Sequence, residues 1–408
     1  MIVRSRIVVT MNGAPIENGA VAVEGERIIA VGKFSEIRAG YSGDVIDLGE
    51  QIVLPGLINA HCHLDYTCLR GAIPQQASFA DWIRAINAKR QSLAPEDYLD
   101  SINSGFAEAA RFGTTTLVNY TGLPELIARV PVPLRTWWCA ELIDVRPGSD
   151  PQSIVASARD NLENAHDSGL APHAPYTASA EIYRAAQRLG GAEGLLRTTH
   201  VAESFEELQM FVHRSGELYD FLKAIGRDMS DCGGVTPFAR AVQLCGGANN
   251  WLFAHVNELT AEDAAALGHI DSLHVVHCPR SHGYFRHGAF QFERLRDAGV
   301  NVCLGTDSLA STPDLNLFAE MREFRCARPH VGAQAVLEMA TVNSAAALGK
   351  SEQLGRVTAG AAADLIAIGD SGVVSDAYET IIAHEGAVEW SMLRGRILIS
   401  ASNFSKLR

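Results

Sequence analysis

Residues 54–63 read Leu-Pro-Gly-Leu-Ile-Asn-Ala-His-Cys-His, an apolar run that ends in two histidines. This run predicts a buried strand at the start of a larger sheet. In an extended strand, residues two apart point to the same side. His61 and His63 can therefore reach one metal ion, while Cys62 points away. An H-x-H pattern alone is weak evidence for a metal site, but its place at a strand end strengthens it.

Seven further apolar runs of strand length follow, and helix-like stretches separate most of them. The eight runs are Leu57-Ile58, Thr114–Val118, Thr136–Leu142, Gly169–Ala171, Leu195–Thr199, Trp251–Ala254, Leu273–Val276 and Val300–Leu304. From His63 to Asp307 the repeat averages roughly 35 residues, near the length of one βα unit. The pattern predicts an α/β fold with a (β/α)₈ TIM barrel. An open doubly wound sheet is the alternative, and the lack of G-x-G-x-x-G after the first strand argues against it.

One intervening helix can be placed from its periodicity. Pro95 stands near its start, and Leu99, Ile102, Phe106 and Ala109 follow at spacings of three and four. Gly113 comes just after its end.

Both ends of the chain contain short strand-like segments with turns. Ala20–Val23 and Ala363–Gly369 are examples. Because chain termini often lie close together, residues 1–54 plus 355–408 are predicted to pair into one small composite sheet domain. Residues 55–354 are predicted to form the catalytic barrel.

The overall composition restricts the classes of partner. The chain has 408 residues with a formal net charge of −13 and no cluster of Lys and Arg. Such a surface disfavours nucleic-acid binding. No apolar run is long enough to span a membrane, and the first residues do not resemble a signal peptide. The eight cysteines are scattered singly, which fits a reducing compartment, so we expect a cytoplasmic protein.

Polar residues stand where a barrel carries its chemistry, at the C-terminal ends of the strands. After the first strand with its two histidines, those ends carry His173, His200, His255, His277 and Asp307. Each histidine taken alone is best interpreted as a hydrogen-bonded strand end. Glu203, beside a helix start predicted by the Ser204-x-x-Glu207 capping pattern, has the alternative of a solvated first-turn acid. Together they indicate a metal site.

Three histidines and one aspartate suit a divalent transition metal and leave a place for water, whose pKa the metal lowers. Zn²⁺ is the first expectation, with Fe²⁺ or Mn²⁺ as alternatives. Two ions usually need a bridging ligand, often a modified Lys late in the fourth strand. The candidate fourth strand, Gly169–His173, has no Lys, so one metal is expected.

Three segments together resemble the amidohydrolase superfamily: Pro55–His63, His200–Glu203 and Gly305–Ser308. The pattern is similar to the branch of cytosine, guanine, methylthioadenosine/S-adenosylhomocysteine and aminofutalosine deaminases and the chlorohydrolases. The resemblance covers nearly the whole chain and implies that the domain formed by both chain ends is a β-sandwich. It implies that His61, His63, His200 and Asp307 bind the metal. It also implies that Asp307 takes a proton from water, that Glu203 shuttles the proton to the substrate, and that His255 orients the water.

The substrate pocket is expected to be built from the loops after the strands. The candidates are Trp82, Arg146, His173, His282 and Ser308. Trp82 has an alternative reading, since its spacing from Phe79 also fits the core face of a helix. His282 stands in a segment where many relatives carry an Asn, which is a departure from the family pattern.

These residues lead to three hypotheses of function. The first is metal-dependent hydrolytic deamination of an amino-substituted purine or nucleoside-like heterocycle, with release of ammonia. The alternative is a chlorohydrolase or cyclic-amide hydrolase of the same superfamily. A non-catalytic scaffold is the third and weakest, because all four proposed ligands are present. The expected partner is a small heterocyclic substrate, with no nucleic acid or membrane, and a homodimer is left open.

Overall fold

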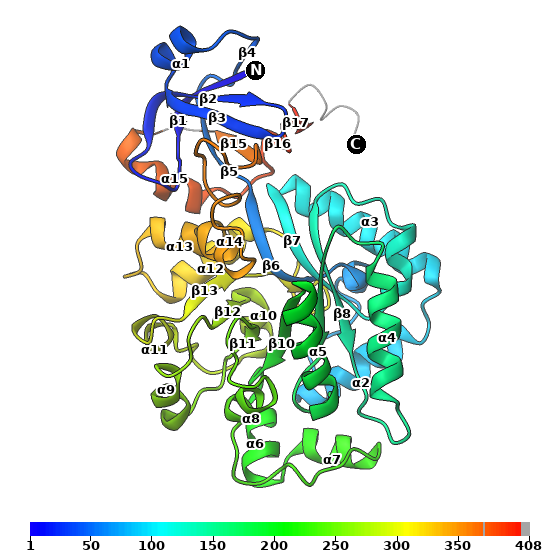
Figure 1. The fold of residues 1–408 in the computed structure, drawn as a ribbon. Coiled ribbons are helices and arrows are strands. Elements are labelled where there is room, and N and C mark those ends of the chain that lie inside the picture. Colours follow the sequence, from blue (N-terminus) through cyan, green and yellow to red (C-terminus); the bar gives the residue numbers. More distant parts are fainter. Residues whose placement is uncertain (370–371, 401–408) are drawn as a thin grey trace. The chain divides into compact units, whose positions relative to one another are not determined.

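The structure, a computed structural model, describes residues 1–369 and 372–400 (Figure 1). By its internal contacts the chain divides into two compact units. One holds residues 1–60, 106–117 and 315–408, and the other holds residues 61–105 and 118–314. Residues 370–371 and 401–408 of the expected composite domain lie outside the described residues. The boundaries expected from the sequence stay a prediction.

A nine-stranded sheet forms the framework of the candidate site. Its strands are β6 (Leu57–His63), β7 (Thr114–Thr121), β8 (Arg135–Leu142), β9 (Asp167–Pro172), β10 (Leu196–Val201), β11 (Leu252–His255), β12 (His274–His277), β13 (Asn301–Leu304) and β14 (Asp307–Ser308). They neighbour one another in sequence order from β6 to β13. Strand β14 follows β13 after two residues and pairs in parallel with β6, so the sheet closes on itself.

This closure confirms the predicted barrel, because β13 and β14 act as two parts of an eighth strand. An open doubly wound sheet is excluded, since its first and last strands would not pair. Every residue of β6 and β7 is buried, as expected for parallel strands that are covered on both faces.

Helices alternate with these strands along the chain (Figure 1). They are α2 (Phe79–Arg90), α3 (Pro95–Arg111), α4 (Pro151–Leu162), α5 (Ala180–Glu193), α6 (Phe205–His213), α7 (Glu217–Ala224), α8 (Pro237–Leu244), α9 (Ala261–Leu267), α10 (Pro279–Phe285), α11 (Phe292–Asp297), α12 (Leu317–Ala327), α13 (Ala333–Met339) and α14 (Val342–Ala347), with 3₁₀ turns η1 (Leu64–Leu69) and η2 (Pro124–Arg129). The helix expected from the apolar spacing after Pro95 is α3. Ile102, Phe106 and Ala109 are buried on it, which confirms the predicted apolar face.

Both chain ends contribute to a second sheet of eight strands. Its strands are β1 (Ile2–Val8), β2 (Ile16–Glu24), β3 (Arg27–Lys33), β4 (Val45–Asp47), β5 (Gln51–Pro55), β15 (Leu365–Gly369), β16 (Trp390–Leu393) and β17 (Arg396–Ile399), accompanied by helices α1 (Phe34–Gly40) and α15 (Ala377–Ala383) and the turn η3 (Val374–Asp376). Strand β5 joins the two ends, pairing in parallel with β1 and antiparallel with β15. Residues from both ends, such as Val21 and Leu365, share one apolar core. The predicted association of the two ends is confirmed.

Within residues 1–369 and 372–400, no helix combines the length and the apolar character needed to cross a membrane.

Candidate active site

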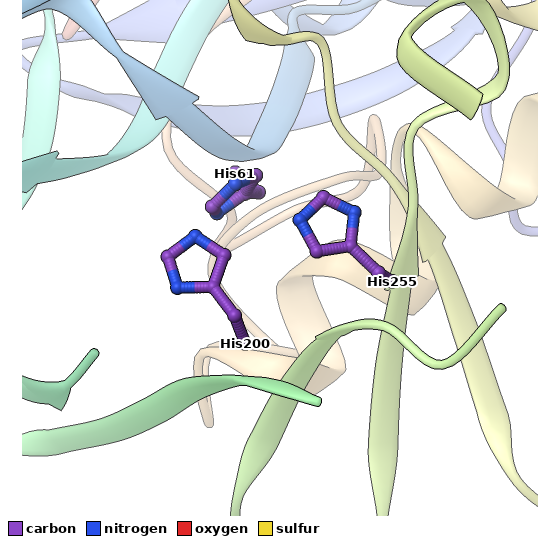
Figure 2. Close-up of side chains that lie close together, drawn as sticks. All are labelled: His61, His200 and His255. Carbon is purple, nitrogen blue, oxygen red and sulfur yellow. The ribbon is translucent and has the colours of Figure 1, made fainter. Parts of the chain in front are cut away.

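The strand ends of the barrel bring four histidines and an aspartate together. His63 ends β6 and His61 precedes it by two residues, His200 is the next-to-last residue of β10, His255 ends β11, and Asp307 begins β14. Figure 2 shows the rings of His61, His200 and His255 facing one another. In each of two sets, His61 with His200 and His255, and His61 with His63 and Asp307, candidate ligand atoms lie within 4.8 Å of one another.

The four rings have an ordered arrangement. The rings of His63 and His200 are nearly parallel, with centroids 5.5 Å apart, and His200 stacks in the same way on His255 at 5.4 Å. His61 stands nearly perpendicular to all three rings. His61 and His63 are both buried, as the two-residue period of the strand requires when the strand ends inside a barrel.

Local backbone geometry holds this cluster in place. His255 and Asp307 have φ angles of 75° and 61°, in the left-handed region that non-glycine residues rarely adopt. Gly305 lies against β6, and a Cβ there would stand 2.8 Å from the carbonyl oxygen of His61. Only a glycine allows this close approach.

Asp307 is held as a carboxylate. Its Oδ1 lies 3.7 Å from Nε2 of His61 and 3.8 Å from Nε2 of His63. Its Oδ2 accepts a hydrogen bond of 2.6 Å from the Ser281 hydroxyl. Burial opposes ionisation, but His61 and the other imidazoles around the carboxylate outweigh it and hold the pKa of Asp307 well below its usual value.

His200 is oriented by the main chain. Its Nδ1 donates a 2.7 Å hydrogen bond to the carbonyl oxygen of His173. A carbonyl oxygen only accepts, so the proton resides on Nδ1 and the lone pair of Nε2 is left for a ligand. Burial and the neighbouring imidazoles lower the pKa of His200 well below its usual value, which keeps the ring in the neutral form that binds metals.

Glu203 lies beside His255, with its Oε1 3.7 Å from Nε2 of that ring. Burial, followed by the charges of Asp307 and Glu207, raises the pKa of Glu203 well above its usual value. Its backbone is fixed because the Glu207 carboxylate accepts the amide hydrogens of Ala202 and Glu203. Helix α6 begins directly after Ser204, whose hydroxyl accepts the amide of Glu207, and this confirms the predicted helix start.

A cavity of about 700 Å³ opens over the cluster. Four residues expected in the substrate pocket line it: Trp82, Arg146, His173 and Ser308. The fifth, His282, is not among the lining residues of this cavity. Its Nδ1 is 3.0 Å from the side-chain oxygen of Asn257. Trp82 also packs against Phe79 and Phe285, so it belongs to an apolar cluster and to the cavity wall.

Sequence reasoning missed Glu141 in the cavity wall. It is the next-to-last residue of β8, and its Oε1 lies 3.9 Å from Nδ1 of His63. Burial raises the pKa of Glu141 to about 7, although the charge of Arg90 opposes the shift. Glu141 could have been identified from its position near the end of the third predicted strand, Thr136–Leu142, because the other site residues also follow or end strands.

Comparison with known proteins gives one extensive family match. The model described as "Amidohydrolase family" matches residues 52–397, and that of an imidazolonepropionase-like composite domain of bacteria matches residues 19–41. A 5-methylthioadenosine/S-adenosylhomocysteine deaminase of Nitratidesulfovibrio vulgaris is 30% identical over 394 residues, which cover 90% of this chain and 83% of that protein.

Two solved structures share the fold across 98% of this chain. The aminofutalosine deaminase of Helicobacter pylori in complex with methylthio-coformycin has a TM-score of 0.85, with 21% identity and 100% of that chain covered. The zinc complex of atrazine chlorohydrolase from Arthrobacter aurescens has a TM-score of 0.81, with 20% identity and 95% of that chain covered.

Proposed function

The chain belongs to the amidohydrolase family, and on this premise we propose that it deaminates an adenine-type nucleoside by hydrolysis and releases ammonia. The observation that carries the proposal is the placing of Glu203. Its buried carboxyl group lines the same cavity as the histidine cluster and lies 3.7 Å from His255. A protonated carboxyl group there can give a proton to a ring nitrogen, which a deaminase needs. Curated relatives named for deamination of such nucleosides support the same reaction.

The residues present fit a divalent metal ion. Three imidazoles and one carboxylate form the proposed ligand set of His61, His63, His200 and Asp307, and such a set suits Zn²⁺, with Fe²⁺ or Mn²⁺ as alternatives. When bound, the ion would supply Lewis-acid chemistry that lowers the pKa of water toward neutrality. The family is metal-dependent, and the identity of the ion is part of the proposal.

The chain's own residues would move the protons. Asp307, ionised, accepts a proton from the attacking water. His255, whose pKa burial lowers to about 3, is neutral and orients that water by a hydrogen bond. Glu203, protonated because of its raised pKa, protonates the ring nitrogen beside the attacked carbon. The proton that Asp307 has taken then goes to the leaving amine, and the remaining proton of the added hydroxyl group returns to Glu203 as the carbonyl forms. Water is thereby consumed, ammonia departs and both carboxyl groups regain their starting protonation states.

The cavity is suited to a small planar substrate. Its volume of about 700 Å³ lies within the usual range for small-molecule sites. Trp82 offers an aromatic face for stacking, and His173 and Arg146 offer polar groups that can bind hydroxyl or carboxylate groups. Ser308, which lines the cavity, and His282, whose Nδ1 lies 3.0 Å from the side-chain oxygen of Asn257, are further proposed contacts of the substrate.

The test is ammonia release by the metal-loaded chain. The substrates to be tested are adenosine, methylthioadenosine, S-adenosylhomocysteine, aminofutalosine, guanine, pterins and cytosine. For each of them, the absorbance change that accompanies loss of the amine is monitored as well. Turnover of one or more adenine nucleosides supports the proposal. Absence of ammonia from every substrate, with metal bound, contradicts it. Chloride release from a chlorotriazine, or ring opening of a cyclic amide, would establish the alternative reaction instead.

Two further expectations belong to this proposal. A homodimer is tested by sedimentation at micromolar concentration, and a cytoplasmic location by fractionation of the source cells. Both rest on the sequence alone.

A further inference from the structure

Two buried polar atoms in the candidate site face each other without a hydrogen bond. They are Nδ1 of His63 and Oε1 of Glu141, and neither has a hydrogen-bond partner. They lie 3.9 Å apart, and the side chains are 8% and 5% exposed. A buried polar atom without a partner destabilises the folded chain, so two such atoms facing each other indicate an interaction that is completed in a functional state.

The two nitrogens of His63 face different groups. Nε2 lies 3.8 Å from Oδ1 of Asp307, on the side of the proposed ligands. Nδ1 faces Glu141 on the other side of the ring. The ring therefore lies between the ligand cluster and the Glu141 carboxylate. Metal-binding histidines commonly have this arrangement, with one ring nitrogen on the metal and the other donating to a carboxylate or carbonyl oxygen.

His200 provides an internal comparison. Its Nδ1 is already held by the carbonyl oxygen of His173 at 2.7 Å, so its Nε2 is directed to the cluster. No backbone carbonyl holds Nδ1 of His63, which is among the buried atoms without a partner. Glu141 is the acceptor placed to do for His63 what His173 does for His200.

Burial disfavours the ionised form of Glu141, and the charge of Arg90 favours it. Arg90 and Glu141 both lie beside Gly122, since a Cβ there would stand 3.4 Å from Nη2 of Arg90 and 3.5 Å from Oε2 of Glu141. Oε1 of Glu141 is the oxygen that lies near His63. Closing the 3.9 Å distance to a charge-assisted hydrogen bond of about 2.8 Å needs a side-chain movement of about 1 Å.

We propose that Glu141 is a positioning residue of the metal centre: its carboxylate accepts a hydrogen bond from Nδ1–H of His63 and directs the lone pair of Nε2 to the metal ion. The proposal rests on the proposed function only in requiring that His63 binds a metal. It needs no assumption about the substrate.

A direct ligand role for Glu141 is the competing arrangement. Candidate ligand atoms of His63, Glu141 and His200 also lie within 4.8 Å of one another. Nδ1 of His200 is held by the carbonyl oxygen of His173, so only Nε2 of His200 could bind an ion in this arrangement. A second ion between Glu141 and Nδ1 of His63 would require the His63 ring to bind two ions at once, as an imidazolate. The positioning role needs neither a second ion nor this deprotonation.

The experiment compares Zn²⁺ affinity, by chelator competition on the full chain, for wild type, Glu141→Leu, Glu141→Asp and Glu141→Gln. Loss of such an outer carboxylate typically weakens metal affinity 10–100-fold, which is expected for Glu141→Leu. Glu141→Asp keeps the charge but moves it away from the His63 ring, so a lower Zn²⁺ affinity is expected for this variant as well. Glu141→Gln keeps an acceptor oxygen and should recover most of the affinity. The d–d spectrum of the Co²⁺ form should change in Glu141→Leu and resemble wild type in Glu141→Gln.

Asp65→Asn is the matched control. Asp65 is a second buried carboxyl group near the centre, and its Oδ2 accepts from Thr121 and Gly122. Its loss of charge should leave Zn²⁺ affinity within about threefold. Equal affinity of wild type, Glu141→Leu and Glu141→Asp would overturn the positioning role, and Glu141→Asp alone decides if the leucine variant does not fold. A fall from two ions per chain to one would identify a ligand instead. Reduced affinity in a chain that releases no ammonia would keep this inference and reject the proposed function.

Discussion

Replacing Glu203 with glutamine tests the proton shuttle most directly. Glutamine has the same shape and can still hydrogen-bond to the substrate, but it cannot give up and take back a proton. General acid–base groups typically contribute 10²–10⁴-fold, so kcat should fall by that factor, which is about 2.7–5.5 kcal/mol in activation free energy. The full factor is expected because Glu203 is 7% exposed, which leaves little room for solvent to replace it.

The assay is steady-state ammonia release across pH, together with Zn²⁺ content. In the wild type, kcat should fall as pH rises through the Glu203 pKa, which burial raises well above its usual value. The reason is that the acid form donates the proton. In Glu203→Gln this alkaline limb should disappear, while KM and bound Zn²⁺ stay within about threefold, since Glu203 is not a proposed ligand.

Glu206→Gln is the matched control for the loss of one carboxylate from the same segment. Glu206 accepts the amides of Phe79 and Ala80 at the start of α2 and does not line the cavity. Its kcat should stay within about threefold of wild type. An unchanged kcat in Glu203→Gln would refute the shuttle. A loss of bound Zn²⁺ there would show that the carboxylate acts on the metal and not on the substrate.

Three further outcomes are expected. Gly305→Ala should weaken Zn²⁺ binding and lower the melting temperature, because its Cβ would stand 2.8 Å from the His61 carbonyl oxygen; calorimetry that finds both unchanged would contradict the close approach. The pKa of Glu207 is raised by burial from 4.5 to about 8, so the folded chain holds a proton that the unfolded chain releases. The contribution of Glu207 to the free energy of unfolding is therefore complete below about pH 4.5 and is lost as pH rises through about 8. The free energy of unfolding should fall by at most about 1.4 kcal/mol per pH unit. Urea titrations of the metal-free chain that show no such decline would contradict the raised pKa of Glu207. Chelation should destabilise the chain, by about 4 kcal/mol if free Zn²⁺ had been at 1,000 times its Kd, and an equal melting temperature with and without chelator would argue against a metal centre.

The sequence by itself determined the local placement of the site residues. The two-residue period of a strand puts His61 and His63 on one side, and Cys62 lies on the other, with its Sγ 3.5 Å from the carbonyl oxygen of Val118. The alternation of apolar runs and helical spacings was sufficient for a barrel, because parallel strands joined by helices have few other ways to bury their faces. Barrel geometry then placed the residues at the strand ends in one region.

Tertiary structure alone decided which of those residues face one another and in what environment. The role inferred for Glu141 depends on its burial and on its 3.9 Å distance from His63. Neither could be predicted from the sequence, where Glu141 is only a carboxylate inside an apolar run. His282 is a second case, because its position after a strand predicted a pocket residue, and only the structure shows that its Nδ1 lies 3.0 Å from the side-chain oxygen of Asn257. The physical reason is the same for both: local periodicity specifies on which side of its own strand a side chain lies. Desolvation, hydrogen-bond partners and pKa depend on atoms that arrive from distant strands once the sheet closes.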